Sequence, residues 1–254
     1  MQALSVIIVC KNEAAIIGAT LESLQGLTDD IVVYDNGSTD GTPDIIRQYK
    51  ATLHQGPWEG YGKTKQKTTT LAKYDWVLSL DADERMDTDL KAALLNLQLA
   101  NKKIVYSLRR KNFLGTQAIN YGEWGNDRQK RLFNRQEVNW DDAEVHEGLI
   151  IPEGVTVEKL DGCILHQTMV DIADYASKTV NYAVLGAEKY FRLGKRSGWV
   201  KIRLAPGFTF FKYFFIKLGF LDGHYGYVCA RMSAHYTFLK YVLLKERYEQ
   251  KRSR

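Results

Sequence analysis

The first third of the chain contains short runs of apolar, mostly β-branched residues, which predict buried strands. Four such strands are expected, at residues 4–9, 31–34, 51–54 and 76–80. Between them helices are expected over residues 14–24, where apolar positions have helical spacing, over 44–50, which follow a run of turn formers and helix caps, and over the polar segment 63–73. Strands that alternate with helices indicate an α/β fold, with a mostly parallel sheet flanked by helices.

Acidic residues follow three of these strands directly. Glu13 comes after the first strand, Asp35 after the second, and Asp81 and Asp83 after the strand at 76–80. The carboxyl ends of parallel strands lie at one edge of a sheet, where open α/β sheets bind their ligands. Three acidic groups are therefore expected to line one crevice. Solvation explains an acidic loop at each place, but it does not explain why all three share this position.

Asp81, Asp83 and Glu84 place three carboxylates within four residues. Carboxylates this close repel one another unless a cation neutralises them. A divalent cation such as Mg²⁺ or Mn²⁺ takes oxygen ligands and bridges a carboxylate to substrate phosphates, so a metal site is one interpretation. The other is an acidic corner that faces water.

The pattern becomes a mixed β region after a helix expected over residues 88–100. Strands are expected at 104–109, 145–149, 155–160 and 164–166, and a hairpin is expected from 131–134 and 137–140. Arg131 precedes an apolar pair, so it points either into the cleft towards phosphate or into solvent. Loops in this region are suited to holding a second substrate.

Two loop residues, Trp124 and Asp127, have the chemistry of a saccharide acceptor site. An aromatic ring offers a platform for a sugar face, and a carboxylate accepts from its hydroxyls; a Trp packed in the core is the alternative. His146 and His166 are each either a metal ligand, a diphosphate partner or a structural histidine.

The C-terminal region differs from the rest in charge. Residues 195–254 contain 13 Lys and Arg against 3 Asp and Glu, whereas the first 194 residues contain 22 against 27. A helix is expected over residues 171–192, and an aromatic-rich basic stretch leads to a final helix with Asp222 as its N-cap. We therefore expect a catalytic domain over residues 1–167 and a helical, membrane-proximal or interface region over residues 168–254.

That basic, aromatic region favours peripheral contact with an anionic membrane, and a homodimer interface is the rival interpretation. Nucleic acid is not expected, because no nucleic-acid-binding motif accompanies the charge. The odd, widely spaced cysteines Cys10, Cys163 and Cys229 fit reduced thiols. No signal peptide and no apolar run of bilayer-spanning length is evident in the sequence. We therefore expect a cytoplasmic protein, peripheral at the inner face of the cytoplasmic membrane.

The order of these motifs resembles the family 2 glycosyltransferases. The resemblance rests on six stretches, namely residues 5–13, 35–42, 76–84, Arg131-Leu132-Phe133, Val145-His146-Glu147 and 219–223. The later stretches are similar to the lipopolysaccharide core β-1,4-glucosyltransferase branch. The family has the GT-A fold of nucleotide-diphospho-sugar transferases, uses nucleotide sugars and inverts the anomeric centre. No phosphate-binding P-loop or dinucleotide-binding glycine motif is present.

The resemblance implies a role for each site residue. Asp35 contacts the uridine of the donor with Glu13 nearby, Asp81 and Asp83 form the Asp-x-Asp element, and Asp83 most directly binds the metal. Glu147 occupies the place of the carboxylate that activates the acceptor. Lys65 lies in a loop near the donor, where this chain reads Thr64-Lys65-Gln66 and relatives tend to carry Gln-Lys-Asn.

The expected function is inverting transfer of a hexose, glucose from UDP-glucose, onto a lipid-linked saccharide such as a lipopolysaccharide inner core. The acceptor hydroxyl needs a base, for which Glu147 is the candidate, and the diphosphate leaving group needs a divalent cation. A nucleotidyltransferase acting on sugar phosphates is the rival enzyme. That class usually needs a basic, glycine-rich loop after the first strand, where this chain has Lys11-Asn12-Glu13. A non-catalytic nucleotide-sugar-binding module is the third interpretation.

Overall fold

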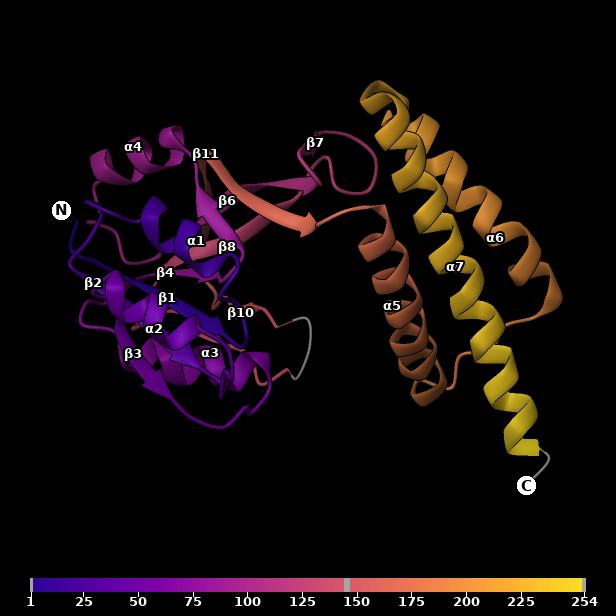
Figure 1. Ribbon diagram of the computed structural model, residues 1–254, viewed down its shortest axis with the longest axis horizontal. Helices are drawn as coiled ribbons and strands as arrows, with labels where there is room; N and C mark the ends of the chain where they lie inside the picture. Colours follow the sequence, from indigo (N-terminus) through magenta and orange to yellow (C-terminus); the bar gives the residue numbers. More distant parts are fainter. Residues whose placement is uncertain (1, 144–146, 253–254) are drawn as a thin grey trace. The chain divides into compact units, whose positions relative to one another are not determined.

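The computed structural model describes residues 2–143 and 147–252. It divides the chain into two compact units (Figure 1). The sheet unit comprises Met1–Arg110 and Asp127–His166, and the helical unit comprises Lys111–Asn126 and Gln167–Arg254. The sequence predicts residues 111–126 as part of the catalytic domain, whereas in the structure they pack with the C-terminal helices.

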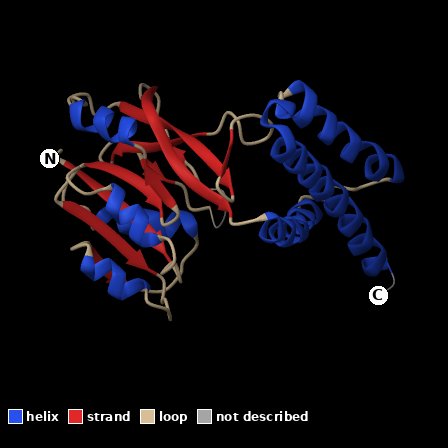
Figure 2. Ribbon diagram, turned by 45° about the horizontal axis from the view of Figure 1, so that its top comes forward, coloured by secondary structure: helices blue, strands red, loops and turns tan. Residues whose placement is uncertain are grey.

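The sheet unit is built on one mixed sheet (Figure 2). Its strands are β1 (Leu4–Cys10), β2 (Asp30–Asp35), β3 (Thr52–Gln55), β4 (Trp76–Asp81), β5 (Glu84–Met86), β6 (Ile104–Leu114), β8 (Arg128–Asn134) and β11 (Thr156–Met169). The order is β3-β2-β1-β4-β8-β6-β11-β5. Strands β3, β2, β1 and β4 run parallel, β8 is antiparallel to both β4 and β6, and β5 is antiparallel to β11. The parallel part is therefore the part that the alternation of strands and helices predicts.

Strand β1 is buried on both faces, which explains its continuous apolar run. Side chains alternate between the faces of a strand, so Leu4, Val6 and Ile8 face one side and Ile7 the other. The first face packs against α1 (Ile17–Ser23), α2 (Thr42–Gln48) and α4 (Thr88–Asn96). The second lies on the side of α3 (Tyr61–Thr70) and of the buried residues Phe133 and Trp140.

The predicted hairpin from residues 131–134 and 137–140 is wrong. After β8 the N–H groups of Glu137 and Val138 donate to the carbonyl of Asn134, so the chain turns away from the sheet. The short strand β9 (Asn139–Trp140) then pairs with β10 (Leu149–Ile150) instead of with β8. The strands predicted at 155–160 and 164–166 form one continuous strand, β11.

The helical unit contains α5 (Ile172–Arg192), α6 (Trp199–Phe211) and α7 (Gly223–Arg252), and α7 packs along both other helices. The short strand β7 (Gln117–Ile119) pairs with the end of β6. Asp171 begins α5 as its N-cap and accepts from the N–H of Asp174. Asp222 immediately precedes α7, the position that was predicted for the N-cap of this helix. Its carboxylate accepts from the backbone N–H groups of Asn120 and Tyr121, at 3.0 and 2.8 Å.

No single helix among residues 2–143 and 147–252 combines the length and the apolar character of a membrane-spanning helix. The stretches Trp199–Ile216 and Gly219–Lys251 reach that composition only as a pair, bent by 73° where they meet.

Candidate active site

The predicted acidic edge of the sheet is confirmed by the strand register. Asp35 ends β2 opposite Cys10, and Asp81 ends β4 opposite Val9, so the two carboxylates flank the end of β1 on either side. Two strand spacings separate their backbones, roughly 10 Å.

Asp35 is fully buried, and its carboxylate holds the loop that follows β2. It accepts from the N–H and hydroxyl of Ser38, and from the amide of Gln55 at 3.0 Å. Burial, with the negative charge of Asp35, raises the pKa of the neighbouring Cys10 thiol to about 12. The thiol therefore stays protonated near neutral pH and is no nucleophile. The predicted contact of Asp35 with uridine requires Ser38 or Gln55 to give way.

Glu13 lies beside the same loop, half-buried at the start of the segment after β1. Its N–H donates to the hydroxyl of Thr42 at 2.8 Å. The N–H of Asn12 donates to the hydroxyl of Ser38, and the side-chain oxygen of Asn12 accepts from the N–H of Thr39. These bonds join the segment after β1 to the loop after β2, as one polar wall at the edge of the sheet.

Asp81 lies between two cations. Its Oδ1 accepts from Lys65 Nζ at 2.9 Å, and its Oδ2 accepts from Arg131 Nη2 at 2.6 Å. Desolvation raises the pKa of the Asp81 carboxyl, but the charges of Arg131 and Lys65 outweigh it and hold that pKa well below its usual range. Lys65 and Arg131 are both buried, so Arg131 does not point into solvent, which was one of its two interpretations.

Glu84 extends this ion-pair network, and its role was not assigned from the sequence. It is fully buried and accepts from Arg131 Nη2 at 2.7 Å and from Arg110 Nη1 at 3.3 Å. Arg110 also pairs with Asp127 at 2.7 Å. Burial lowers the pKa of Arg110, and the charges of Glu84 and Asp127 raise it further than burial lowers it. The sequence could have pointed to Glu84, because it is the third acidic residue in the cluster at the end of β4. Nothing in the sequence pointed to Arg110.

Glu147 joins the network through Lys65. Its Oε1 accepts from Lys65 Nζ at 2.6 Å, and 15% of its side chain is exposed. The loop that carries Glu147 is closed at its base, because the Asp141 N–H donates to the Gly148 carbonyl and the Asp141 carboxylate accepts from the Gly148 N–H. Glycine is required at position 62, at the start of α3, because a Cβ there would collide with the Asp141 carbonyl. Asp141 therefore lies directly against the helix that carries Lys65.

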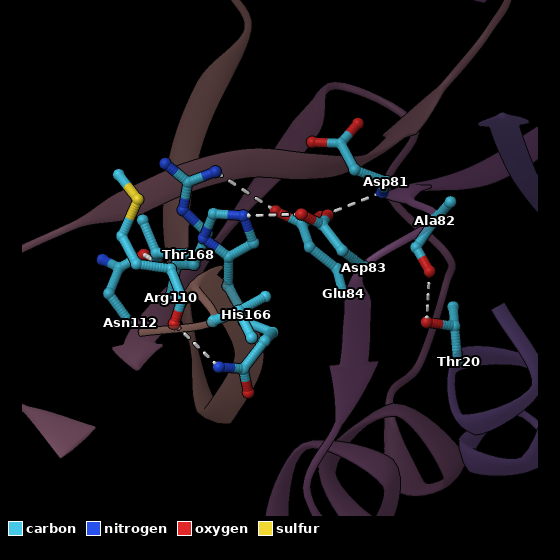
Figure 3. Close-up of polar contacts among 12 residues, drawn as sticks. Thr20, Asp81, Ala82, Asp83, Glu84, Arg110, Asn112, His166 and Thr168 are labelled. Atoms are coloured by element: carbon cyan, nitrogen blue, oxygen red, sulfur yellow. Dashed lines mark hydrogen bonds and ion pairs between the residues drawn. The ribbon is translucent and has the colours of Figure 1, made fainter. Parts of the chain in front are cut away.

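Asp83 lies on the turn between β4 and β5, next to a histidine from β11 (Figure 3). His166 Nε2 is 3.1 Å from Asp83 Oδ2, and 31% of the Asp83 side chain is exposed. The turn is fixed from α1, because the Thr20 hydroxyl donates to the Ala82 carbonyl at 2.7 Å. Figure 3 shows Asp83 and His166 directed towards one another, on a different side from the Asp81 carboxylate. His166 thus lies in the site; His146 lies outside the described residues.

The two predicted acceptor residues, Trp124 and Asp127, belong to different units of the structure. Trp124 belongs to the helical unit, where its ring packs 5.1 Å from that of Tyr175. Asp127 belongs to the sheet unit, in its pair with Arg110. Trp124 therefore has the packed position that the sequence left open as the alternative.

A hollow of about 500 Å³ is lined by residues of α3, such as Lys63 and Lys67, and by residues further along the chain, such as Arg135 and Asn139. Among the described residues, none of the predicted site residues lines it. The chemistry concentrates instead at the open edge of the sheet.

Three comparisons place this chain among known proteins. Residues 5–149 match the family model described as Glycosyl transferase family 2. The chain is 32% identical over 223 residues to the lipopolysaccharide core biosynthesis glycosyltransferase LpsC of Rhizobium meliloti, which covers 84% of this chain and 80% of that protein. It is 26% identical over 245 residues to an uncharacterized glycosyltransferase of Rickettsia prowazekii, with 90% and 82% covered.

Among solved structures, glucosyl-3-phosphoglycerate synthase from Mycobacterium tuberculosis, in complex with Mn²⁺, UDP-glucose and phosphoglyceric acid, is 24% identical. The match covers 44% of each chain with a TM-score of 0.36.

Proposed function

Because this chain belongs to glycosyl transferase family 2, we propose that it transfers glucose from UDP-glucose to a lipid-linked saccharide of the lipopolysaccharide inner core type. The acceptor is supported by the 32% identity to a relative whose name places it in lipopolysaccharide core biosynthesis. The GT-A fold class follows from the family match and agrees with the mixed sheet flanked by helices.

One observation carries the proposal, namely the continuous ionic contacts from Glu147 through Lys65 and Asp81 to Arg131. With Glu84, Arg110 and Asp127 this network reaches across β4, β8 and β6. A carboxylate suited to accept a proton is thereby fixed beside the acidic edge of the sheet. Inverting transfer needs this arrangement, because the acceptor hydroxyl must lose its proton as it attacks C1 of the donor sugar.

In this proposal Glu147 is the base. A carboxylate has two oxygens, so Oε2 can accept from the acceptor hydroxyl while Oε1 stays on Lys65. The bond from the Lys65 ammonium fixes the position of the Glu147 carboxylate. Lys65 would therefore orient the base, and Glu147 would touch the reacting hydroxyl.

The residues at the turn after β4 fit a divalent cation. The network and Asp83 together contain five carboxylates against three cations, a formal charge of −2 when His166 is neutral. Asp83 offers a partly exposed oxygen and His166 a nitrogen, and Mn²⁺ accepts both donor types. A bound cation would supply charge to stabilise the diphosphate leaving group.

Each oxygen of Asp81 already accepts from a cation, one from Lys65 and the other from Arg131. Asp83 and His166 are therefore the residues we propose for the cation, with Asp81 holding the two buried cations in place. Among the described residues, no three His, Cys, Asp or Glu side chains form a ready ligand set. Diphosphate oxygens and water would complete the coordination, as Mg²⁺ and Mn²⁺ commonly allow.

Incubation of the full chain with UDP-glucose and Mn²⁺ tests the proposal. Slow release of UDP and glucose is expected without an acceptor, and faster release is expected with a lipid-linked core saccharide. A thermal-shift screen of nucleotide sugars, with metal present, identifies the donor, because a ligand that binds the native state raises its stability. Stabilisation by a different nucleotide sugar alone would reject UDP-glucose. Pyrophosphate chemistry with a sugar phosphate would favour the nucleotidyltransferase instead.

A further inference from the structure

Helix α6 and the stretch that joins it to α7 expose many large apolar side chains. Helix α6 has no buried residue, and side chains such as Leu204 and Phe208 are 67% and 64% exposed. The exposed large apolar residues of this stretch are Trp199, Val200, Leu204, Phe208, Phe211, Phe215, Ile216, Leu218, Phe220 and Leu221. A contiguous run of this kind marks an interaction surface.

The charge of the same stretch has one sign. Residues 195–221 contain six cations and no Asp or Glu; the cations are Lys195, Arg196, Lys201, Arg203, Lys212 and Lys217. Two of them lie against aromatic rings of the stretch, with Arg203 Cζ 3.6 Å from the Trp199 ring centroid and Lys212 Nζ 5.1 Å from that of Tyr213. Aromatic bulk and positive charge therefore occupy the same surface.

The corner after α6 is tightly built, so the exposed rings are held on a fixed backbone. Helix α6 continues into a π-helical turn, Lys212–Ile216, and a 3₁₀ turn, Gly219–Asp222, leads into α7. Glycine is required at position 226, because a Cβ there would collide with the Gly219 carbonyl oxygen. Phe210 and Phe214 stack 5.2 Å apart, and the Tyr227 ring of α7 lies edge-on to both.

We propose that residues 195–221 dock on the surface of an anionic lipid bilayer. The aromatic side chains would lie at the level of the headgroups, and the six cations would lie against the lipid phosphates. The docking stretch, as we call residues 195–221, has the composition that such surfaces select, with large apolar side chains beside Lys and Arg.

Charge complementarity decides between a bilayer and a second copy of this chain. A symmetric dimer contact uses the same patch on both subunits, so the cations of one docking stretch would face those of the other. No acidic residue of the stretch could pair with them. An anionic bilayer supplies that negative charge along its whole surface, and it accepts the aromatic rings as well.

Vesicle flotation with the full chain tests this inference, and it needs neither donor nor acceptor. A failed docking test therefore leaves the proposed transferase standing, and a failed transferase assay leaves the docking standing. We expect flotation with phosphatidylcholine vesicles that contain phosphatidylglycerol and little flotation with phosphatidylcholine alone. High salt should weaken the binding at least about ten-fold, because screening shortens the range of exposed charges.

Two variants separate the contributions of charge and aromatic bulk. The double substitution Lys201→Glu with Lys217→Glu should abolish flotation, whereas Lys103→Glu with Lys159→Glu should not. The second pair makes the same change in net charge at exposed positions of the sheet unit. Phe208→Ser with Phe211→Ser should weaken binding even at low salt, and its thermal unfolding should match that of the wild type because both rings are exposed.

Either of two results would overturn the inference. One is that the wild type stays unbound to anionic vesicles at low salt. The other is that both charge-reversal pairs weaken binding equally, which would show that the binding depends on the net charge of the protein and not on the position of the cations. If light scattering instead shows a dimer that the Phe208→Ser with Phe211→Ser variant dissociates, the docking stretch is a self-association surface.

Discussion

Lys65 Nζ lies 2.6 Å from Glu147 Oε1, so a buried ammonium from α3 holds the candidate base. The same ammonium donates to Asp81 Oδ1 at 2.9 Å and lies 5.1 Å from the centroid of the Trp140 ring. One side chain thus connects the loop that carries the base to the acidic end of β4. Changes at Lys65 and at Glu147 should therefore have different signatures.

Glu147→Gln should reduce the turnover number by about 10²–10⁴-fold, because the amide keeps the shape of the side chain but cannot accept a proton. Donor affinity should change little, since the substitution leaves Asp83 and His166 untouched. Steady-state kinetics with a saccharide acceptor and calorimetry with UDP measure the two quantities. Glu153→Gln, at an exposed position after β10, is the matched control and should behave as wild type. If Glu147→Gln keeps activity within a few-fold of wild type, Glu147 is not the base, and Asp127 is the next carboxylate to test.

Lys65→Met should lower both stability and turnover. Removing one partner of a buried ion pair leaves the carboxylates of Asp81 and Glu147 without that cation, which costs about 3–5 kcal/mol. Urea unfolding measures the loss of stability. The turnover number is measured at low temperature, where the variant is folded, so that it reflects the activity of the folded protein. Lys65→Arg should restore part of kcat, because a guanidinium keeps the charge although its geometry differs.

Lys67→Met is the control for that series. Lys67 lies two residues further along α3 and pairs on the surface with Glu59, so its loss should lower the stability far less than the loss of Lys65 does. Equal destabilisation by Lys65→Met and Lys67→Met would show that the buried contacts of Lys65 contribute no more stability than a surface ion pair.

Asp83→Ala should abolish turnover and the metal-dependent part of UDP binding while leaving the fold intact, because the residue lies on a turn. Chelation of divalent cations should have the same effect on the wild type, and added Mn²⁺ should reverse it. His166→Ala should weaken Mn²⁺ binding more than Mg²⁺ binding, since nitrogen ligands suit Mn²⁺ better. Asp161→Ala, exposed on the same strand as His166, is the control. Metal-dependent UDP affinity that survives in Asp83→Ala would exclude Asp83 as a ligand.

The parallel half of the sheet was predictable because its signals are local. Val6, Ile7 and Ile8 belong to an apolar run that is typical of a strand buried on both faces, and Asp35 and Asp81 lie where two such strands end. Strand direction then requires them to share an edge, so the site could be located before any distance was known.

The contacts that complete the site were not predictable, because they join residues far apart in the sequence. Arg131 lies 47 residues from Glu84, and Lys65 lies 82 residues from Glu147. No spacing rule covers such pairs. The same reason applies to residues 111–126, which the long-range bonds from Asp222 to Asn120 and Tyr121 hold in the helical unit.

Asp81 should also make the fold sensitive to acid. Its pKa in the folded protein lies below the ordinary value of about 3.9 that it takes in an unfolded chain. As the pH falls through that ordinary value, the unfolded state binds a proton that the folded Asp81 does not. The stability that its contacts with Arg131 and Lys65 provide is therefore complete above that pH, and it is lost progressively as the pH falls below it.

Asp81→Asn should remove this part of the acid sensitivity. The amide cannot titrate, and Arg131 and Lys65 keep Glu84 and Glu147 as partners, so the variant should fold. We expect it to be less stable than wild type at about pH 5 and to lose less stability between about pH 5 and about pH 3. Urea unfolding midpoints at the two pH values measure both effects, with the exposed Asp161→Asn as control. Should wild type and Asp81→Asn lose the same stability over that interval, the acid sensitivity arises from other carboxylates and the ion pairs of Asp81 do not control it.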